Sequence, residues 1–121
     1  MDSNKYKQIF KIQTINLIND LLLVFDNDQM IINIKEKMLI SFDEKDFFDN
    51  LSKYFSKNIE FGINNRDMEL ILDSKKYLLP ISTENIVKLK LQNYWLNLNL
   101  SNKDKIWSYL NILLNIYNNI L

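Results

Sequence analysis

The segment 103–121 constrains the fold most, because it predicts a long helix whose apolar side must be covered by protein. Ser101 and Asp104, at capping-box spacing, predict where this helix begins, and no charged residue follows Lys105. Apolar residues then recur at alternating steps of four and three, which places them along one helix face. They are Ile106, Leu110, Leu113, Tyr117 and Ile120, with Trp107, Leu114 and Leu121 in a second row. The sequence leaves open whether the cover is the rest of this chain, a second copy or another protein.

The composition is that of one globular domain without the residues that most enzymes use. The chain has 121 residues, 47% of them hydrophobic and 25% charged, which suits a single domain with its own core. It has no cysteine, no histidine and one glycine, which excludes disulfides, zinc sites built on Cys or His, imidazole bases and Gly-rich phosphate loops. The sequence therefore predicts a protein that is not an enzyme. It offers no catalytic, metal-binding or cofactor-binding residue and no evident small-molecule substrate.

The numbers of acidic and basic residues indicate which class of partner the protein binds. Fifteen basic residues balance fifteen acidic ones, so the formal net charge is zero. A nucleic-acid-binding protein usually carries a basic excess, because contacts with phosphates supply much of its affinity, so nucleic acid is disfavoured here. The first residues are polar, which disfavours a signal peptide, and no apolar run is long enough to predict a membrane span. We expect an intracellular protein.

The first part of the chain predicts two helices joined by a polar turn. The first helix runs from about Lys5 to Phe25, and residues 21–25 are apolar on all sides, so we expect this end to be deeply buried. Residues 26–28 end the helix, because Asp and Asn side chains compete for backbone partners and favour turns. A second helix is expected to follow through Met30, Ile34 and Met38.

The middle of the chain predicts the most clearly amphipathic helix. Ser41 and Glu44 have the spacing of a capping box. Apolar residues then follow on one helix face, namely Phe47, Phe48, Leu51, Tyr54, Phe55 and Ile59. Gly62, Asn64 and Asn65 are expected to end this helix.

Beyond that break the pattern is weaker until the C-terminal helix begins. Residues 68–72 predict a short helix, and Pro80 predicts an extended connector. A further helix, capped by Ser82 or Thr83, is favoured for 86–100. Apolar and polar residues alternate in parts of this last segment, which also fits strands. However, no glycine is present there to turn a hairpin.

Charged residues form several small groups. Oxygen ligands for a divalent cation could come from an acidic group made up of Asp43, Glu44, Asp46 and Asp49. The better explanation is that these residues complement the positive end of the helix dipole. The lysines could bind phosphate groups. Because the chain has no net positive charge, the better explanation is that they lie on solvated faces. The lysines are Lys5, Lys7 and Lys11, then Lys75 and Lys76, then Lys88 and Lys90.

Aromatic residues and leucines are concentrated between Tyr94 and Leu121. A base-stacking platform is one interpretation of Tyr94, Trp95, Trp107 and Tyr109, although aromatic residues at helical spacing more often belong to a core. Aromatic residues also anchor protein interfaces. We expect the C-terminal helix to provide a contact surface made up of Trp107, Leu110, Leu114, Tyr117 and Leu121. An ordinary bundle core is the alternative, and it fits these residues equally well.

Two motifs, one near each end of the chain, carry a family resemblance. The front motif has the form FxxxxxxLIxDLxxxF and comprises Phe10, Leu17, Ile18, Asp20, Leu21 and Phe25. The back motif has the form KxxIWxYL and comprises Lys103, Ile106, Trp107, Tyr109 and Leu110. With these motifs the chain resembles small α-helical proteins of unknown function encoded by nucleocytoplasmic large DNA viruses (giant viruses), although Asp26 stands where those proteins often have proline. The resemblance implies a viral origin and a helical fold, and it implies no catalytic residue.

Taken together, these patterns predict an all-α fold: a single compact bundle of five or six short helices formed by residues 1–121. We expect the first and last helices to pack together, with the helix over Phe47–Ile59 at the centre. The expected function is that of a non-catalytic protein-interaction or structural component, a subunit of a larger viral assembly in the host cytoplasm or the virion. Its partner would be another protein or a second copy. A nucleic-acid-associated accessory protein is the alternative, and a metal- or carboxylate-dependent enzyme is favoured least.

Overall fold

The chain folds into helices joined by short turns. A computed structural model describes residues 3–53, 55–73 and 84–120, and within these ranges it contains no strand. The elements are α1 (Ser3–Val24), α2 (Gln29–Phe42), a short 3-10 helix (Leu51–Lys53), α3 (Lys57–Asn64), α4 (Met68–Asp73), α5 (Glu84–Asn97) and α6 (Leu100–Ile120). The predicted all-α bundle is confirmed, with six α-helices in the described part of the chain.

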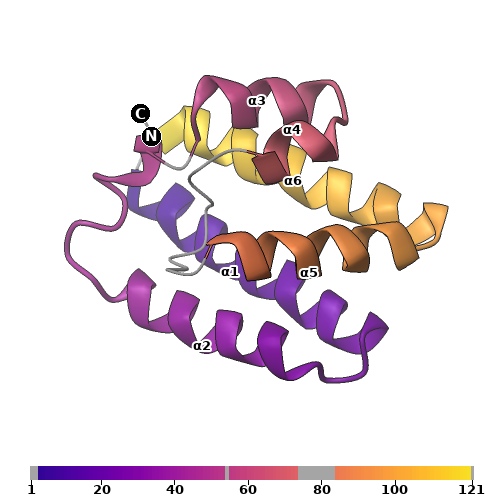
Figure 1. Cartoon of the computed structure of the whole chain (residues 1–121). Coiled ribbons are helices and arrows are strands. Elements are labelled where there is room, and N and C mark those ends of the chain that lie inside the picture. Colours follow the sequence, from indigo (N-terminus) through magenta and orange to yellow (C-terminus); the bar gives the residue numbers. More distant parts are fainter. Residues whose placement is uncertain (1–2, 54, 74–83, 121) are drawn as a thin grey trace.

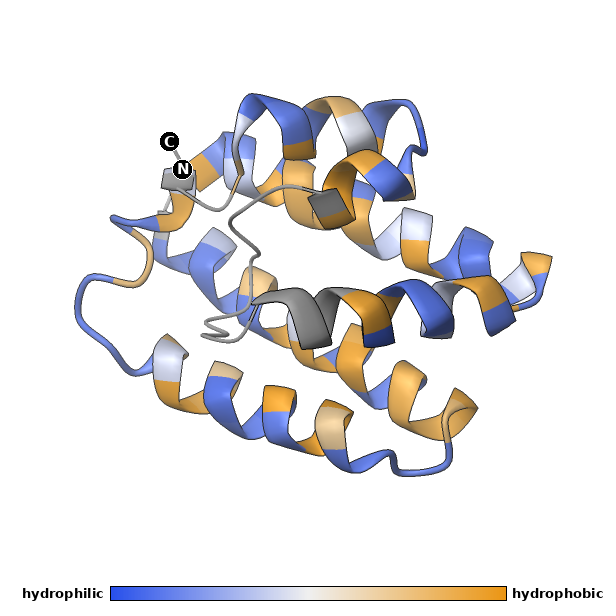
Figure 2. Cartoon of the chain, in the orientation of Figure 1, coloured by the Kyte–Doolittle hydropathy of each residue, from blue (hydrophilic) through white to orange (hydrophobic). Residues whose placement is uncertain are grey.

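The first and last helices form the main contact of the bundle, as predicted. α1 packs along α6 more extensively than any other pair of helices, and the two run in opposite directions (Figure 1). α2 folds back beside α1, α3 contacts both α6 and α4, and α4 contacts α5. Figure 2 shows that most helices carry an apolar side and a polar side, as amphipathic helices around a shared core do.

The turn between α1 and α2 forms where the sequence predicts it. Asp26 and Asn27 have φ values of 51° and 58°, in the left-handed region that these two residue types tolerate best after glycine. The next residue, Asp28, caps α2, because its Oδ1 accepts hydrogen bonds from the amides of Met30 at 2.9 Å and Ile31 at 3.2 Å. The polar turn therefore ends one helix and starts the next.

The predicted helix over Phe47–Ile59 is wrong. α2 continues to Phe42, residues 43–50 form a series of turns, and the next α-helix begins only at Lys57. Segment 43–50 is rich in Asp and ends in Asn, both weak helix formers, so a local cap signal is not enough to start a helix there. The turns instead fold the aromatic residues of this segment back onto the core.

The cap predicted for this helix is wrong as well. Ser41 is buried inside α2, with 6% of its surface exposed, rather than standing at a helix start. The cap of α3 is Ser56, whose Oγ accepts a hydrogen bond from the amide of Ile59 at 3.3 Å. Ser41 fails as a cap because α2 continues through Phe42, which packs in the core, and Ser41 is itself buried within that helix.

A chain of aromatic rings forms the centre of the core and joins three segments. The ring of Phe42 meets Phe47 edge-on at 5.1 Å between centroids. Phe10 of α1 lies edge-on to Phe48 at 6.0 Å and to Phe55 at 6.2 Å. These offset and edge-to-face arrangements add to the energy of burial. The described apolar residues of the middle segment therefore do reach or pack against the core, although most of them do so from outside any α-helix. Tyr54 lies outside the described residues.

Gly62 lies inside α3 and does not end it. The helix continues to Asn64, and Asn65 caps its C-terminus. A Cβ atom on Gly62 would lie 2.6 Å from Cγ1 of Ile71 and 3.1 Å from the carbonyl oxygen of Asp67. The absence of a side chain therefore allows α3 and α4 to approach closely.

The second half of the chain is helical, as favoured. α4 matches the predicted short helix, and α5 replaces the strand alternative for the segment that begins near residue 86. The start of α6 differs: the side chain of Asn99, rather than Ser101, accepts a hydrogen bond from the amide of Asn102 at 2.8 Å. The predicted connector at Pro80 and the predicted caps Ser82 and Thr83 lie outside the described residues.

Candidate interaction surfaces

The row of α6 that was predicted to contact a partner lies against the chain's own helices. Trp107 and Leu114 are each 4% exposed, and Tyr117 is 8% exposed. Leu110 is partly buried against the same core, and Leu121 lies outside the described residues. In this fold the chain itself covers the apolar side of α6, as the bundle-core alternative has it.

Aromatic partners account for much of this burial. The ring of Tyr117 stacks on Phe55 at 4.6 Å between centroids, with 12° between the planes. Trp107 meets Trp95 of α5 edge-on at 5.2 Å, and the ammonium of Lys103 lies 5.3 Å from the centre of the Trp95 ring. Rings packed on other rings do not offer the free faces that a base-stacking platform needs.

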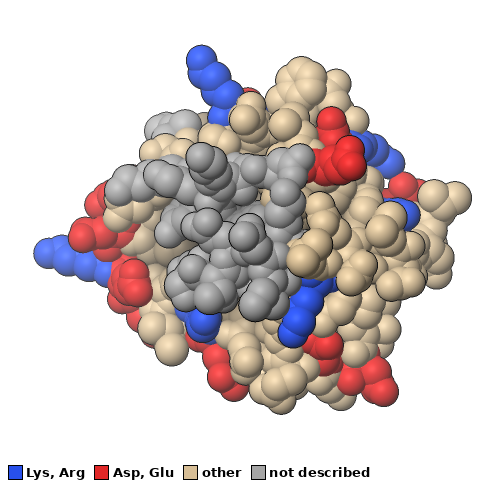
Figure 3. Space-filling view, viewed as in Figure 1, with Lys and Arg blue, Asp and Glu red and all other residues tan. Residues whose placement is uncertain are grey.

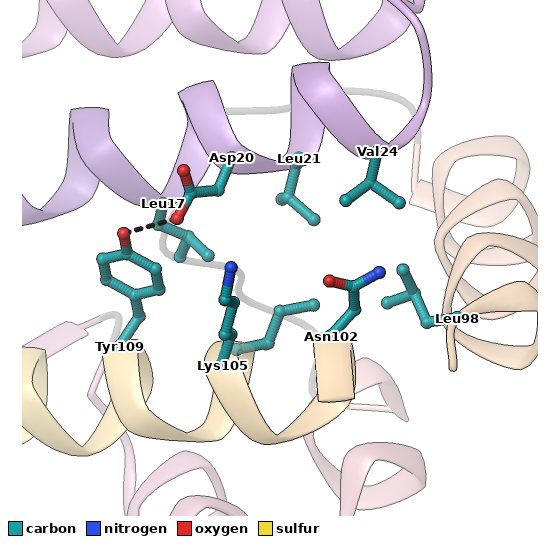
Figure 4. A pocket seen from close by; sticks show the side chains of 9 residues that line it. Leu17, Asp20, Leu21, Val24, Leu98, Asn102, Lys105 and Tyr109 are labelled. Atoms are coloured by element: carbon teal, nitrogen blue, oxygen red, sulfur yellow. Dashed lines mark hydrogen bonds between the residues drawn. The ribbon is translucent and has the colours of Figure 1, made fainter. Parts of the chain in front are cut away.

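A polar contact closes the seam between α1 and α6. Tyr109 donates a hydrogen bond from its hydroxyl to Oδ2 of Asp20 at 2.6 Å (Figure 4). This bond to a carboxylate raises the pKa of Tyr109, and burial of the ring adds to the effect. Lys105 and Asn102 reach from α6 toward the same gap, whose volume is about 10 Å³. That is room for about one water molecule, so this gap is too small to hold a ligand.

A second tyrosine joins α5 to the turn between α1 and α2. The hydroxyl of Tyr94 donates to Oδ2 of Asp28 at 2.7 Å, and its ring stacks on Phe25 at 4.7 Å. Burial, with help from the bond to the carboxylate, raises the pKa of Tyr94 to about 12. The same bond holds the pKa of Asp28 below its usual value, and the two backbone amides that this carboxylate caps act in the same direction.

The acidic group is exposed, as are Lys5 and Lys90, whereas Lys7 and Lys11 are partly buried. The four acidic residues Asp43, Glu44, Asp46 and Asp49 are exposed in the turns after α2, and the described residues contain no group of three or more acidic side chains placed to hold a metal ion. The ammonium groups of Lys7 and Lys11 lie 5.6 and 5.8 Å from the centre of the Phe48 ring. Lys75 and Lys76 lie outside the described residues. None of the described helices is both long and apolar enough to cross a bilayer.

One end of the bundle leaves apolar side chains in solvent. The three most exposed large apolar side chains of the described chain are Leu23 at 82%, Leu100 at 78% and Leu96 at 73%. All three lie where α1 ends and α5 turns into α6 (Figure 1), and Val24, 42% exposed, lies beside Leu23. The two parts meet, since Val24 and Leu98 line the same small gap. We call Leu23, Val24, Leu96 and Leu100 the apolar end.

The apolar end corrects a prediction. Residues 21–25 were expected to be deeply buried because the helix is apolar on all sides there. The structure buries Leu21, Leu22 and Phe25 in part against the core and leaves Leu23 and Val24 exposed. The helix has more apolar surface at this end than one chain covers. Figure 3 shows uncharged side chains over most of the neighbouring α5–α6 turn.

A second apolar surface lies between α1 and α2. Ile12 is 55% exposed and Leu39 is 47% exposed, on facing helices. They line a shallow hollow together with Lys11, Ile15, Asn16, Phe42 and Asp43. We call this hollow the α1–α2 groove. Periodicity alone could not separate its residues from the core, because Ile12 and Leu39 have the same chemistry as their buried neighbours.

Comparison of the chain with models of protein families, with curated proteins and with solved structures finds no match.

Proposed function

We propose that this protein is a non-catalytic interaction component that binds another protein through its apolar end. The observation that carries the proposal is the exposure of Leu23, Leu96 and Leu100 at one end of the bundle. Burial of one leucine side chain is worth about 1.5–3 kcal/mol, so a partner that covers several of them gains much of the affinity of a specific complex. Exposed apolar patches commonly mark protein interfaces, and we infer that these side chains form one such patch.

The charge pattern supports a protein partner rather than nucleic acid. The acidic and basic residues are equal in number, and Lys7 and Lys11 lie over Phe48, beside a turn that contains four acidic residues. A strand of nucleic acid near these lysines would therefore also meet carboxylates. The leucines of the apolar end suit the apolar centre of a protein interface, and Arg66, Asp67 and Glu69, which share a hollow with Leu96, would lie at its polar edge.

The contact surface proposed here is not the aromatic row of α6. That row is occupied by Phe55, Trp95 and other residues of the same chain, so α6 would contribute to binding at its first residue, Leu100. On the sequence resemblance, we also propose that the partner belongs to a viral assembly. The protein would then act in the host cytoplasm or in the virion.

Site-specific photo-crosslinking tests this proposal. A photoreactive phenylalanine analogue is placed at Leu23 or Leu100 and, as a matched control, at Phe61 of α3 or Leu89 of α5, which are 57% and 61% exposed. In an extract of the cells that express the gene, we expect one discrete adduct from the two positions at the apolar end and none from the control positions. Excess unlabelled protein should compete for this adduct.

The competitor variants make the test specific. The double variant Leu23→Ser/Leu100→Ser should fail to compete, whereas Phe61→Ser/Leu89→Ser should compete like the unmodified chain. All four positions are exposed, so both variants are expected to fold, and circular dichroism checks this. Equal adducts from both pairs of positions, or competition by the apolar-end variant, would contradict the proposal.

A further inference from the structure

The α1–α2 groove combines apolar side chains with one charge of each sign. Ile12 and Leu39 are about half exposed on facing helices, and Ile15 and Phe42 continue the lining inward to the core. Lys11 and Asp43 are the charged members of the lining. The groove therefore has mainly apolar walls, with a positive charge at Lys11 on α1 and a negative charge at Asp43, just beyond the end of α2.

These two charges are not paired with each other within the chain. In the part of the chain that the structure describes, the single ion pair joins Arg66 to Asp104 at 3.0 Å. The ammonium of Lys11 lies over the Phe48 ring at 5.8 Å, and the carboxylate of Asp43 is exposed in the turn after α2. Both groups can therefore take a partner from outside.

A surface with this composition is complementary to itself. In a two-fold symmetric dimer the same patch of both copies meets, so residue i of one copy contacts residue j of the other and the reverse. Apolar side chains would then pack on their own equivalents, and Lys11 of each copy would face Asp43 of the other. The formal net charge of zero removes long-range repulsion between two copies.

Other occupants fit less well. The turn that follows the groove carries Glu44, Asp46 and Asp49 against a single lysine, Lys45, so its net charge is negative and would disfavour an anionic surface such as nucleic acid or a lipid headgroup layer. A partner protein of a single sign of charge would satisfy only one of the two groove charges. We propose that the α1–α2 groove is the contact surface of a homodimer, in which two α1–α2 hairpins pack as a four-helix arrangement. This proposal does not depend on the apolar end.

A charge-swap series tests the dimer. Sedimentation velocity over a series from low micromolar to near-millimolar protein should show the mass rise from 14.6 kDa toward twice that value. Because the two-fold axis repeats each contact, Lys11→Glu and Asp43→Lys should each raise the dissociation constant by about tenfold. The double variant Lys11→Glu/Asp43→Lys should return it to within about threefold of the original, because the opposite charges again meet.

Two further variants separate this proposal from the proposed function. Ile12→Ser/Leu39→Ser should abolish the dimer, whereas Leu23→Ser/Leu100→Ser at the other surface should leave its dissociation constant unchanged. A mass of one chain at every concentration would overturn the dimer and leave the photo-crosslinking result unaffected. A dimer whose dissociation constant is unchanged by the charge variants would have its contact elsewhere. So would a dimer that is lost in the variant Leu23→Ser/Leu100→Ser. Either result would overturn the proposed homodimer contact.

Discussion

At the scale of single residues, two tyrosine hydroxyls link segments that are far apart in sequence. Tyr94 reaches Asp28, which is also the cap of α2, and Tyr109 reaches Asp20 near the C-terminal end of α1. In each case one carboxylate oxygen takes a hydrogen bond from a ring that is itself partly buried. Hydrogen bonds to charged groups are stronger than neutral ones, so each tyrosine fixes the position of the helix that carries it.

The raised pKa of Tyr94 predicts a loss of stability at high pH. The unfolded chain releases this proton near pH 10, whereas the folded chain keeps it to about 12, so the free energy of unfolding should fall as pH rises between these values. Tyr94→Phe should make this decline shallower and, near neutral pH, should cost about 1–2 kcal/mol through the lost bond to Asp28. Urea denaturation near neutral pH and at about pH 11 measures both effects.

The ring contact makes Tyr94→Phe a clean change. Phenylalanine keeps the stacking on Phe25, so any loss comes from the hydroxyl. A variant with the wild-type decline at high pH would show that the Tyr94 proton does not contribute to stability there.

At the scale of helices, the prediction from sequence was good where periodicity is long and failed where it depended on a short signal. α1 and α6 repeat their apolar residues over about twenty positions, and both form as expected. Ser41 and Glu44 have the spacing of a helix start, but whether Ser41 caps one helix or is buried in the previous one depends on tertiary packing. No local pattern contains that information.

The candidate surfaces were hidden from sequence for a related reason. Leu23 and Leu22 are the same residue type and adjacent, yet one is 82% exposed and the other packs against the core. Helical spacing places Leu22 on one face with Ile18 and Phe25, but because residues 21–25 are apolar on every side, the pattern does not show that the side bearing Leu23 stays in solvent. The aromatic row of α6 was predicted to be a contact surface and is buried instead. The sequence could not separate the two cases, because protein cores and protein interfaces use the same aromatic and aliphatic residues.

The position of the helix cap gives a prediction at this scale. Ser56→Ala should destabilise the chain by about 1 kcal/mol, because it leaves the amide of Ile59 without its partner at the start of α3. Ser41→Ala should cost less, since Ser41 lies inside α2 and alanine is the better helix former. Thermal or urea unfolding of the two variants measures the difference, and a larger loss from Ser41→Ala would restore the predicted cap.

At the scale of the whole molecule, the pairing of α1 with α6 holds the bundle together. These two helices form its most extensive contact, and α2 and α3 pack onto them from either side (Figure 1). The burial of the apolar side of α6 by α1 is therefore expected to contribute much of the free energy of unfolding.

Substitutions at two neighbouring residues of α6 test whether this side of the helix contributes to stability. Leu113 is 0% exposed and Ile112 is 41% exposed, so they probe the two sides of one helix turn. Leu113→Ala should lower the free energy of unfolding by about 2–5 kcal/mol, because it leaves a cavity in the core. Ile112→Ala should cost much less. Equal losses from the two variants would mean that α6 does not bury the side described here.

The pairing of α1 with α6 also sets the order of events during synthesis. The two partners are separated by the whole middle of the described chain, so on the ribosome α1 can be joined by α2 and the turns that follow well before α6 has been made. The part of α1 that packs on α6 stays uncovered during that interval. A nascent chain that carries α1 without α6 should therefore depend more on chaperones than one that carries both helices.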